Sequence, residues 1–596
     1  MKKRVADIIM ETLEKNGITN AFCVPGGGAM HLNNALALSS IKTIFNHHEQ
    51  ACAISCEGYA KYSSKPALCC VTSGPGGTNA LTGVMGAYQD YTPIFVLSGQ
   101  VRYNTTVEEC GLNIRRRGEQ EFDIVNSVKN MTKYAKMIID PLSIKREIQK
   151  AFDIMMSGAR GPVWIDVPLD IQSSEIEEDE LYPVLSKPTI KECSEEDFGY
   201  IVDVLNKAKR PIILAGSAIR SSGQREQFLK LLNNWQIPVV SACCVADNLY
   251  NEHHLYLGTT GTVGSRKANI AIQNADVILN LGCSLGFKQT TFSQDTFAPK
   301  AHMIMVNTNP DEAKKPGLKV DKFIHADLVS FFSKANGSQI SIGVSDKWLN
   351  YCSKLKDRFG DFDDIIHQKP EEPIRVQEFW QKYYEQEPDE NIVILGNSSC
   401  VQGRLAFSVN KKNQRSIVNI NCGSMGCDIP LAIGASIAAN KEVTLVTGDG
   451  SFMMNSQELA TIKHNNLPIK IILFSNKGYA AIRNTCRSYF NNKMFGCSKE
   501  SGLSFPDFQI QASAYGLNYK SCEKTSDLTK SISWLNEQNG SCILEINQIY
   551  QDEMLPSLKS RLNSDGTFSK IALHDMYPFL DREELKEYMI NEEEKC

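Results

Sequence analysis

The 596-residue sequence predicts an α/β fold with three doubly wound parallel-sheet domains followed by a C-terminal tail. A chain of this length is too long for one hydrophobic core. Short apolar runs alternate with helix-like stretches in three segments, as parallel α/β layers require, and polar, acidic stretches separate those segments. We therefore expect domains at residues 1–175, 196–345 and 346–550, a linker at 176–195 and a tail at 551–596.

The expected elements follow from local patterns in each segment. Val5, Ile8, Ile9 and Leu13 stand at helical spacing, and "GPVWIDVPLDIQ" is a strand closed by Pro168. The second segment has buried strands in "RPIILAGSAI", "ADVILNLGCSL" and "HMIMVNTNP". The third has them in "NIVILG", "VTLVTG", "IKIILFS" and "CILEIN". The tail carries recurring Leu, Met, Tyr and Phe, so we expect it to pack against the body.

Composition excludes several classes of protein. A net charge of -5 is close to neutral for this length, which argues against a nucleic-acid partner. No uncharged apolar stretch reaches 18 residues, so no membrane partner is expected. Asp7, Glu11 and Glu14 interrupt the N-terminal stretch where a signal peptide would be apolar, and we expect a cytoplasmic protein. The 19 cysteines form no CxxC pair, which argues against a zinc or iron–sulfur site.

Two polar residues follow neighbouring strands of the third segment. Asp449 stands in "GDG" after "KEVTLVT", and Asn476 follows "IKIILFS" 27 residues later. That spacing leaves room for a crossover helix over "NSQELATIKHNN" and a return strand, so both side chains reach one edge of the sheet. A carboxylate, an amide oxygen and a backbone carbonyl suit Mg²⁺ that also binds phosphate oxygens.

This pattern resembles the thiamine diphosphate enzymes, whose motif is GDG, 25 to 30 residues, then an Asn pair. The resemblance implies thiamine diphosphate and Mg²⁺ as cofactors, with Asp449, Asn476 and the carbonyl of Gly478 as metal ligands. Ser475 departs from the motif, because it replaces the first Asn of the pair. The neighbouring residues that would bind the cofactor are Gly450, Ser451 and Tyr479.

The N-terminal segment resembles the same family, in its acetolactate synthase branch, through "FNHHEQACAISCEGYAKYSSKPALCCVTSGPGGTNALTG". The cofactor needs a carboxyl beside its pyrimidine ring, because protonation of N1′ helps the amino nitrogen to take the thiazolium C2 proton. The resemblance assigns this catalytic role to Glu49. Glu57 is the rival; its family counterpart packs near the dimer interface, so we prefer Glu49.

Further site residues come from the same resemblance. Pro25, Gly26, Thr72, Pro75 and Asn79 would line the pyrimidine side. Gln120 would face the substrate, although an exposed Gln at a helix start is an equally simple interpretation. In the third segment the remaining candidates are Asn397 and Ser398 as diphosphate donors, the Gly423 carbonyl as acceptor of the pyrimidine amino group, and Met425 as the side chain over which the cofactor bends.

The middle segment leaves FAD as an open alternative. Acetolactate synthases bind FAD there with a glycine-rich run and an Arg after "GA". This chain has "LGCSLGFKQTTF" without that Arg, while "LGTTGTVGSRKAN" still resembles one FAD-facing loop.

The resemblance implies decarboxylation of a 2-oxo acid, pyruvate by preference, with transfer of the acyl unit to a second carbonyl. The tail resembles those of acetolactate-synthase-like proteins of surface-sugar pathways, which implies a keto-sugar nucleotide as acceptor. A homodimer or homotetramer with the active site shared between subunits is expected. Three alternatives stay open: a non-ligating decarboxylase, an NAD-dependent oxidoreductase, which would need a GxGxxG that is absent here, and a non-catalytic assembly protein.

Overall fold

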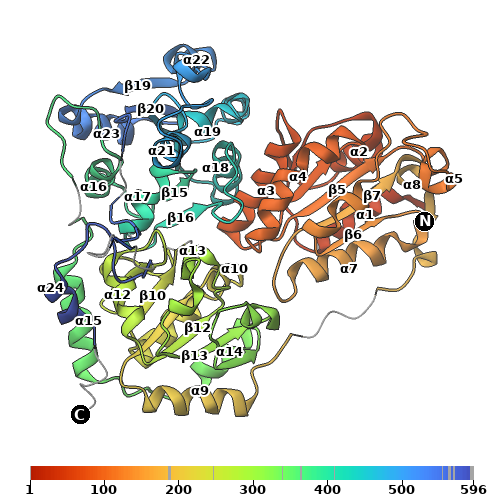
Figure 1. Cartoon of the computed structure of the whole chain (residues 1–596). Coiled ribbons are helices and arrows are strands. Elements are labelled where there is room, and N and C mark those ends of the chain that lie inside the picture. The colour runs from red at the N-terminus through yellow and green to blue at the C-terminus, as the bar shows by residue number, and fades with distance from the viewer. Residues whose placement is uncertain are drawn as a thin grey trace.

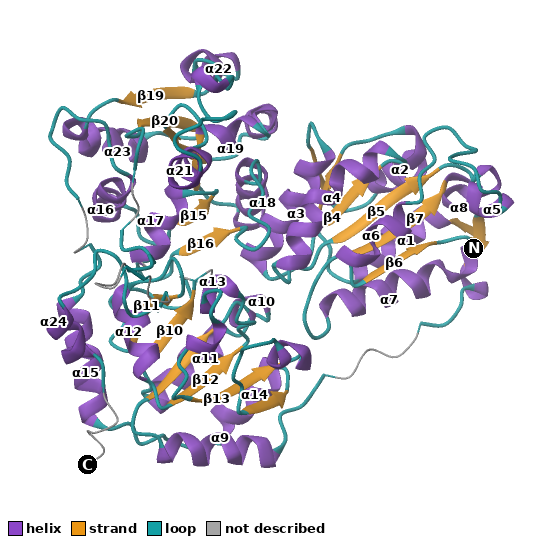
Figure 2. Cartoon of the chain, in the orientation of Figure 1, coloured by secondary structure: helices purple, strands orange, loops and turns teal. Residues whose placement is uncertain are grey.

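The computed structural model confirms the predicted fold class: it contains three six-stranded parallel sheets with helices around them (Figure 1, Figure 2). It describes residues 2–590 except for 185–189, 244, 246, 339, 363–365, 408–409, 553–554, 562–565 and 568–570. Within that part of the chain, no helix is both long enough and apolar enough to cross a membrane.

The N-terminal sheet has the strand order β3–β2–β4–β5–β7–β6, and every neighbouring pair is parallel. A separate strand, β1 (Lys2–Arg4), pairs antiparallel with β8 (Glu175–Glu177). The predicted linker therefore begins with a strand, while its residues 185–189 lie outside the described residues. The strands of the sheet are β2 (Asn20–Cys23), β3 (Lys42–Phe45), β4 (Leu68–Val71), β5 (Phe95–Gln100), β6 (Tyr134–Met137) and β7 (Val163–Pro168).

Helices cover both faces of this sheet, which is why its central strands are continuous apolar runs. The first helix, α1 (Val5–Lys15), buries the periodic apolar residues that predicted it. Two helices begin at the carboxyl ends of strands and carry site residues: α3 (Glu49–Ser63) and α4 (Pro75–Gln89).

The middle sheet has the order β11–β10–β9–β12–β13–β14. The three strands expected from sequence are present as β9 (Pro211–Ala215), β12 (Val277–Leu281) and β13 (His302–Asn307). Three more were not predicted: β10 (Val239–Ala242), β11 (Tyr256–Thr260) and β14 (Lys322–His325).

The C-terminal sheet has the order β16–β15–β17–β18–β20–β19. Its four predicted strands are β15 (Ile392–Leu395), β17 (Val443–Gly448), β18 (Ile469–Ser475) and β20 (Cys542–Asn547); β16 (Arg415–Val418) and β19 (Asn518–Cys522) were not predicted. The crossover helix expected over "NSQELATIKHNN" is present as a 3-10 turn (Ser456–Glu458) that continues into α20 (Leu459–His464). A short helix before it, α19 (Asp449–Met453), was not predicted.

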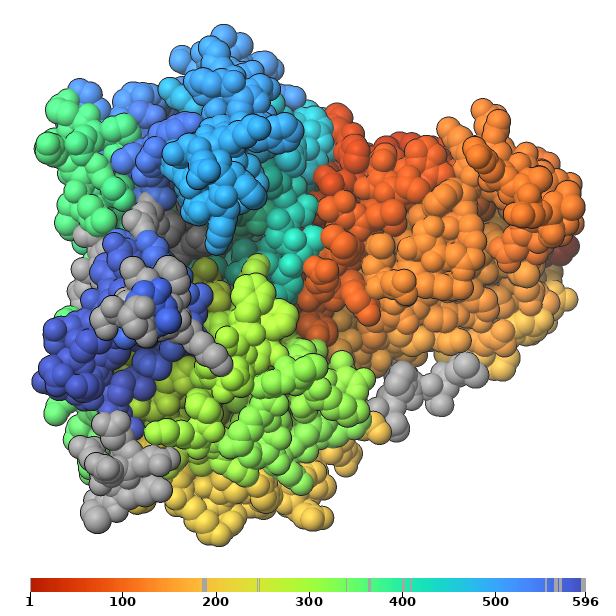
Figure 3. Space-filling view, viewed as in Figure 1, coloured from red at the N-terminus to blue at the C-terminus, as the bar shows by residue number. Residues whose placement is uncertain are grey.

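The first and third sheets share one topology. Numbered by their order along each domain, the strands of both run 2-1-3-4-6-5 across the sheet, whereas those of the middle sheet run 3-2-1-4-5-6. The two like domains meet through α3 and α18 (Asp428–Ala439) and share one hydrophobic core (Figure 1). Figure 3 shows the N-terminal domain, in red and orange, against the C-terminal domain, in teal and blue. The helices approach so closely that a Cβ on Gly434 would overlap the carbonyl oxygen of Ser55.

The described part of the tail packs on the middle domain, which confirms that it is ordered against the body. Leu573 is buried in a core cluster of that domain. Arg266 donates to the carbonyl oxygens of Met576 and Pro578, each at 3.0 Å. The last helix is α24 (Arg582–Tyr588).

Candidate active site

The N-terminal half of the site lies at the carboxyl edge of its sheet, where α3 and α4 begin. Glu49 is the first residue of α3, after His48, whose ring accepts a hydrogen bond from the Gln50 backbone N–H at 3.1 Å. The Glu49 side chain is half-buried and accepts from Asn79 Nδ2 at 2.9 Å. A Cβ on Gly76, in the first turn of α4, would lie 3.7 Å from Glu49 Oε1. Glu49 therefore lies partly buried against the first turn of α4.

Other N-terminal candidates gather around the same point. A Cβ on Gly26 would lie 2.6 Å from the Thr72 side chain, so this backbone approach needs glycine. Gln120 is in a loop with φ of 60°, not at a helix start, and its carbonyl oxygen lies against Gly74. Pro75 follows Gly74 as the first residue of α4. The structure thus brings together the N-terminal candidates, namely Pro25, Gly26, Glu49, Thr72, Pro75, Asn79 and Gln120.

The C-terminal half of the site centres on Asp449, the first residue of α19 and only 2% exposed. One carboxylate oxygen accepts from the Gly450 N–H at 2.8 Å, and the other accepts from the N–H groups of Asn476 at 3.1 Å and Gly478 at 3.2 Å. Burial raises the pKa of Asp449 to about 6. The two loops predicted to meet at the end of the sheet are therefore joined through this carboxylate.

Met425 and its loop lie beside Asp449. A Cβ on Gly450 would lie 3.1 Å from Met425 Cε and would overlap the Tyr479 ring. The Gly426 N–H donates to Ser451 Oγ at 2.8 Å. Asn397 donates to the Ser424 carbonyl, and Ser398 immediately precedes α17 (Ser399–Phe407). The structure therefore also brings together the C-terminal candidates, namely Asn397, Ser398, Gly423, Met425, Asp449, Gly450, Ser451, Asn476, Gly478 and Tyr479.

The two halves contact each other within one chain. Asn455 Nδ2 donates both to Gln50 Oε1 at 2.9 Å and to the Gly426 carbonyl at 2.6 Å. Glu458 accepts from Asn46 Nδ2 and from the His47 N–H, each at 2.9 Å. The helix that begins with Glu49 is thus held against the segment that follows "GDG".

Equivalent strands supply the two halves. In the N-terminal sheet, Pro25 follows the first strand, Glu49 the second and Thr72 the third. In the C-terminal sheet, the first three strands are followed in the same order by Asn397 and Ser398, by Gly423 and Met425, and by Asp449. Because the carboxyl ends of parallel strands are the usual ligand sites of α/β sheets, the two like domains present like edges to one ligand.

Comparison with protein families agrees with this arrangement. The thiamine pyrophosphate enzyme N-terminal TPP binding domain matches residues 3–127, the central domain of these enzymes matches 199–334, and their C-terminal TPP binding domain matches 396–546. The chain belongs to the thiamine pyrophosphate enzymes. The two TPP binding domains of the family are therefore the two domains that share one topology here.

Individual relatives of this thiamine pyrophosphate enzyme are acetolactate synthases. A probable acetolactate synthase large subunit of Methanocaldococcus jannaschii is 32% identical over 530 residues, 86% of each chain. The acetolactate synthase large subunit of Lactococcus lactis is 30% identical over 576 residues, 96% of each chain. A chloroplastic acetolactate synthase of Arabidopsis thaliana is 29% identical over 591 residues, 96% of this chain and 84% of the relative. The resemblance to the acetolactate synthase branch is confirmed.

The residues present fit thiamine diphosphate with Mg²⁺. The Asp449 carboxylate is buried, and the hydrogen bonds that it accepts from the described residues all come from backbone N–H groups. A divalent cation would supply the positive charge that stabilises a carboxylate deprived of water. On the pyrimidine side, Thr72 Oγ1 is buried and has no hydrogen-bond partner among the described residues. A ligand that contacts both halves would supply a partner to each of these groups.

Arg483 is a site residue that sequence reasoning missed. It lies on α21 (Ala480–Tyr489), is fully buried, and donates to Asn476 Oδ1 at 2.8 Å. Asn476 Nδ2 donates in turn to Gln548 Oε1 at 3.2 Å. These two contacts fix the orientation of the Asn476 amide and hence the position of Oδ1, the atom that would bind the metal. Only the fold reveals this role, because Arg483 stands in a polar helix with no motif around it.

We expect an Arg483→Gln variant to bind Mg²⁺ about 10- to 100-fold more weakly, because loss of a partner that orients a metal ligand typically costs that much. The Kd for Mg²⁺ is measured by isothermal titration calorimetry at a fixed concentration of thiamine diphosphate. Arg487→Gln is the matched control, since Arg487 lies one turn further along α21, over the Tyr550 ring at 5.8 Å. Equal Mg²⁺ affinity in the two variants would contradict the assigned role.

Proposed function

We propose that the protein uses thiamine diphosphate and Mg²⁺ to decarboxylate a 2-oxo acid, pyruvate by preference, and transfers the acyl unit to a second carbonyl compound. One observation carries the proposal: the Glu49 half and the Asp449 half are held against each other through the Gln50–Asn455 hydrogen bond. Neither half alone could bind both ends of the cofactor. The acetolactate synthase relatives support a ligating reaction in preference to a simple decarboxylation.

Each group has a distinct proposed role. Asp449, Asn476 and the Gly478 carbonyl would hold Mg²⁺, and the donors from Asn397, Ser398, Gly450, Ser451 and Tyr479 would surround the diphosphate. The bound cofactor supplies a thiazolium ring that acts as an electron sink for loss of CO₂. Glu49 would hold the proton for pyrimidine N1′, and the Gly423 carbonyl and the Met425 side chain would orient the pyrimidine amino group. Gln120, an exposed residue whose backbone lies against Gly74, would contact the substrate.

We propose a keto-sugar nucleotide as the acceptor, because the tail sequence resembles those of acetolactate-synthase-like proteins of surface-sugar pathways. The test supplies purified protein with thiamine diphosphate, Mg²⁺ and pyruvate, alone or with a keto-sugar nucleotide, and identifies products by mass spectrometry. A product that contains the sugar and two added carbons supports the proposed acceptor. Acetolactate alone would assign the second pyruvate as acceptor, and acetaldehyde alone would favour the non-ligating alternative.

We propose a location for FAD in the middle domain and assign it no step in the reaction. A cavity of about 390 Å³ lies at the carboxyl ends of the middle strands, lined in part by Ser217, Gly282, Asn307 and Asp327. A sheet of order 3-2-1-4-5-6 places its ligand crevice there. Non-oxidative acyl transfer needs no electron acceptor, so any flavin bound in this cavity would not turn over. Pyruvate-dependent bleaching of a bound flavin would indicate an oxidase instead.

Assembly into at least a homodimer is proposed on new grounds. A site shared between subunits was expected from the resemblance; in the structure one chain supplies both halves, so the contact between the halves does not by itself require a second chain. Apolar side chains instead remain exposed on the segment after Asn476: Tyr489 is 78% exposed, Phe490 60% and Phe495 86%. A second copy of the chain would cover such residues.

The family resemblance implies that the N-terminal half of one subunit pairs with the C-terminal half of its neighbour. We therefore expect a mixture of inactive Glu49→Gln and inactive Asp449→Ala subunits, allowed to exchange, to recover part of the activity. One site of each mixed dimer would then have both halves intact. Mixed dimers that form but stay inactive would show that each chain completes its own site.

A further inference from the structure

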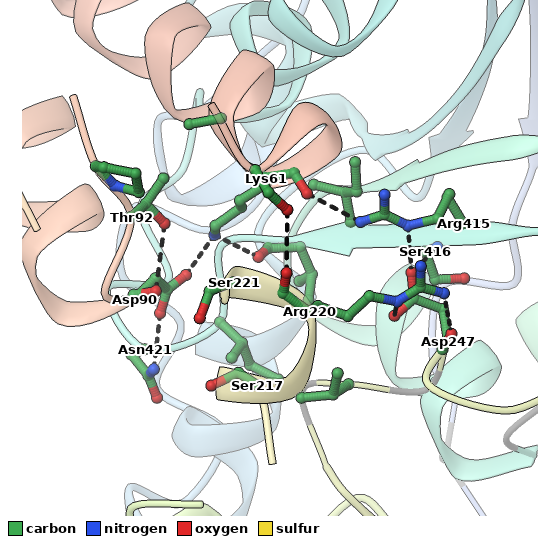
Figure 4. Close-up of a pocket in the computed structure, with 17 residues that line it drawn as sticks. Lys61, Asp90, Thr92, Ser217, Arg220, Ser221, Asp247, Arg415, Ser416 and Asn421 are labelled. Atoms are coloured by element: carbon green, nitrogen blue, oxygen red, sulfur yellow. Dashed lines mark hydrogen bonds and ion pairs between the residues drawn. The ribbon is translucent and has the colours of Figure 1, made fainter. Parts of the chain in front are cut away.

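A buried charged cluster joins the N-terminal and C-terminal domains outside the proposed cofactor site. Its members are Glu57 and Lys61 of α3 and Asp90 at the end of α4. Lys61 Nζ lies 2.6 Å from Glu57 Oε1 and 2.5 Å from Asp90 Oδ2, and it donates to the Val418 carbonyl at 2.7 Å. Figure 4 shows Lys61 and Asp90 beside a cavity of about 90 Å³ where all three domains meet.

Two asparagines connect this cluster to the loop of residues 419–427, which contains Gly423 and Met425. Asn419 Nδ2 donates to both oxygens of Glu57, at 3.1 and 3.0 Å, and Asn419 Oδ1 accepts from the Gly423 N–H at 3.0 Å. Asn421 Nδ2 donates to Asp90 Oδ1 at 2.7 Å (Figure 4). Only the first of these connections reaches Gly423.

The burial of Glu57 suits a positioning role better than a contribution to the stability of the fold. Its side chain is fully buried, and this burial raises the pKa of its carboxyl, while Lys61 opposes the shift. Buried ion pairs often stabilise a fold no better than apolar side chains of the same volume. The sequence interpretation of its family counterpart placed this position near a dimer interface; here Glu57 lies inside one chain, against the segment that leads to Met425.

The Gly423 backbone depends on such an outside restraint. Its φ of 59° lies in the left-handed region, and the residue is exposed between two turns, outside any helix or strand. The Asn419 side chain accepts a hydrogen bond from the Gly423 N–H, and the Glu57 carboxylate accepts from the Asn419 amide. Two hydrogen-bonded steps therefore connect α3, the helix that begins with Glu49, to the peptide of Gly423.

We infer that Glu57 and Asn419 are positioning residues: they hold the Gly423 peptide where its carbonyl can accept a hydrogen bond from the pyrimidine amino group. The inference rests on the proposed function. It also couples the two halves: docking of α3 both delivers Glu49 and fixes the loop opposite to it. Because errors of about 1 Å in such a position can slow a reaction about 100-fold, the effect should be measurable.

The test is the rate at which the C2 proton of bound thiamine diphosphate exchanges with deuterium, measured by acid quench and proton NMR with cofactor and Mg²⁺ saturating. We expect Asn419→Ala to slow exchange about 10- to 100-fold. Asn421→Ala is the matched control, since it also loses a bond to an N-terminal carboxylate but does not contact Gly423; it should stay within about twofold of wild type. A merely structural role would lower the melting temperature without changing exchange in the cofactor-bound protein.

The outcomes distinguish a failure of the proposed function from a failure of the positioning role. Wild-type exchange no faster than that of free cofactor would contradict the proposed function itself. Fast exchange in wild type and in Asn419→Ala alike would overturn this inference and leave the proposed function standing. If Asn419→Ala does not fold, Glu57→Gln is judged by the same criterion; it retains the side-chain size but loses the charge, and we expect at least about threefold slower exchange.

Discussion

An Asp449→Ala variant should lose cofactor binding, with the Kd for thiamine diphosphate at saturating Mg²⁺ raised more than about 100-fold. Loss of a partner that merely orients a metal ligand costs about 10- to 100-fold in metal affinity, and Asp449 is proposed as the only charged ligand. Its carboxylate also joins the two loops, through the N–H groups of Asn476 and Gly478. Quenching of intrinsic fluorescence on cofactor addition gives the Kd.

Asp449→Asn separates these two contributions. Asparagine retains an oxygen that can accept from the loop N–H groups but removes the charge, so its Kd should fall between those of wild type and Asp449→Ala. Near-normal thiamine diphosphate affinity in Asp449→Ala would show that the metal site lies elsewhere.

A Glu49→Gln variant should bind the cofactor normally and lose most of its decarboxylation. Glutamine fills the same space and can still accept from Asn79, but it has no proton to give to N1′. General acid–base groups contribute about 10²- to 10⁴-fold to rate, and we expect a loss of that size in CO₂ release from pyruvate at saturating cofactor. A loss below about tenfold would assign the proton to another group.

The sequence predicted the interior strands of the fold better than the edges. The strands found in advance, such as β17 and β18, are apolar runs in the middle of a sheet with helices on both faces. Four of the five strands missed in the middle and C-terminal sheets, namely β11, β14, β16 and β19, lie at sheet edges. Edge strands keep polar residues on their open side, as in "NYKSC" of β19, so no continuous apolar run marks them.

The candidate site was predictable where chemistry follows directly from a strand end. Asp449 and Asn476 could be paired from spacing alone, because a crossover connection returns the chain to the same edge. Arg483, Asn455 and Asn419 could not be found in this way. Their contacts depend on how α3 docks on α18 and how α21 folds back, which are long-range results of packing that leave no local pattern.

The most direct test of the account is a structure of the protein with thiamine diphosphate and Mg²⁺ bound. We predict that one cofactor lies between the two like domains. Its N1′ should be within hydrogen-bond distance of a Glu49 carboxyl, about 2.6 to 3.2 Å, and Mg²⁺ should be about 2.0 to 2.1 Å from oxygens of Asp449, Asn476 and Gly478. A cofactor bound at another edge, or a Glu49 carboxyl that does not contact the pyrimidine ring, would contradict the proposed site.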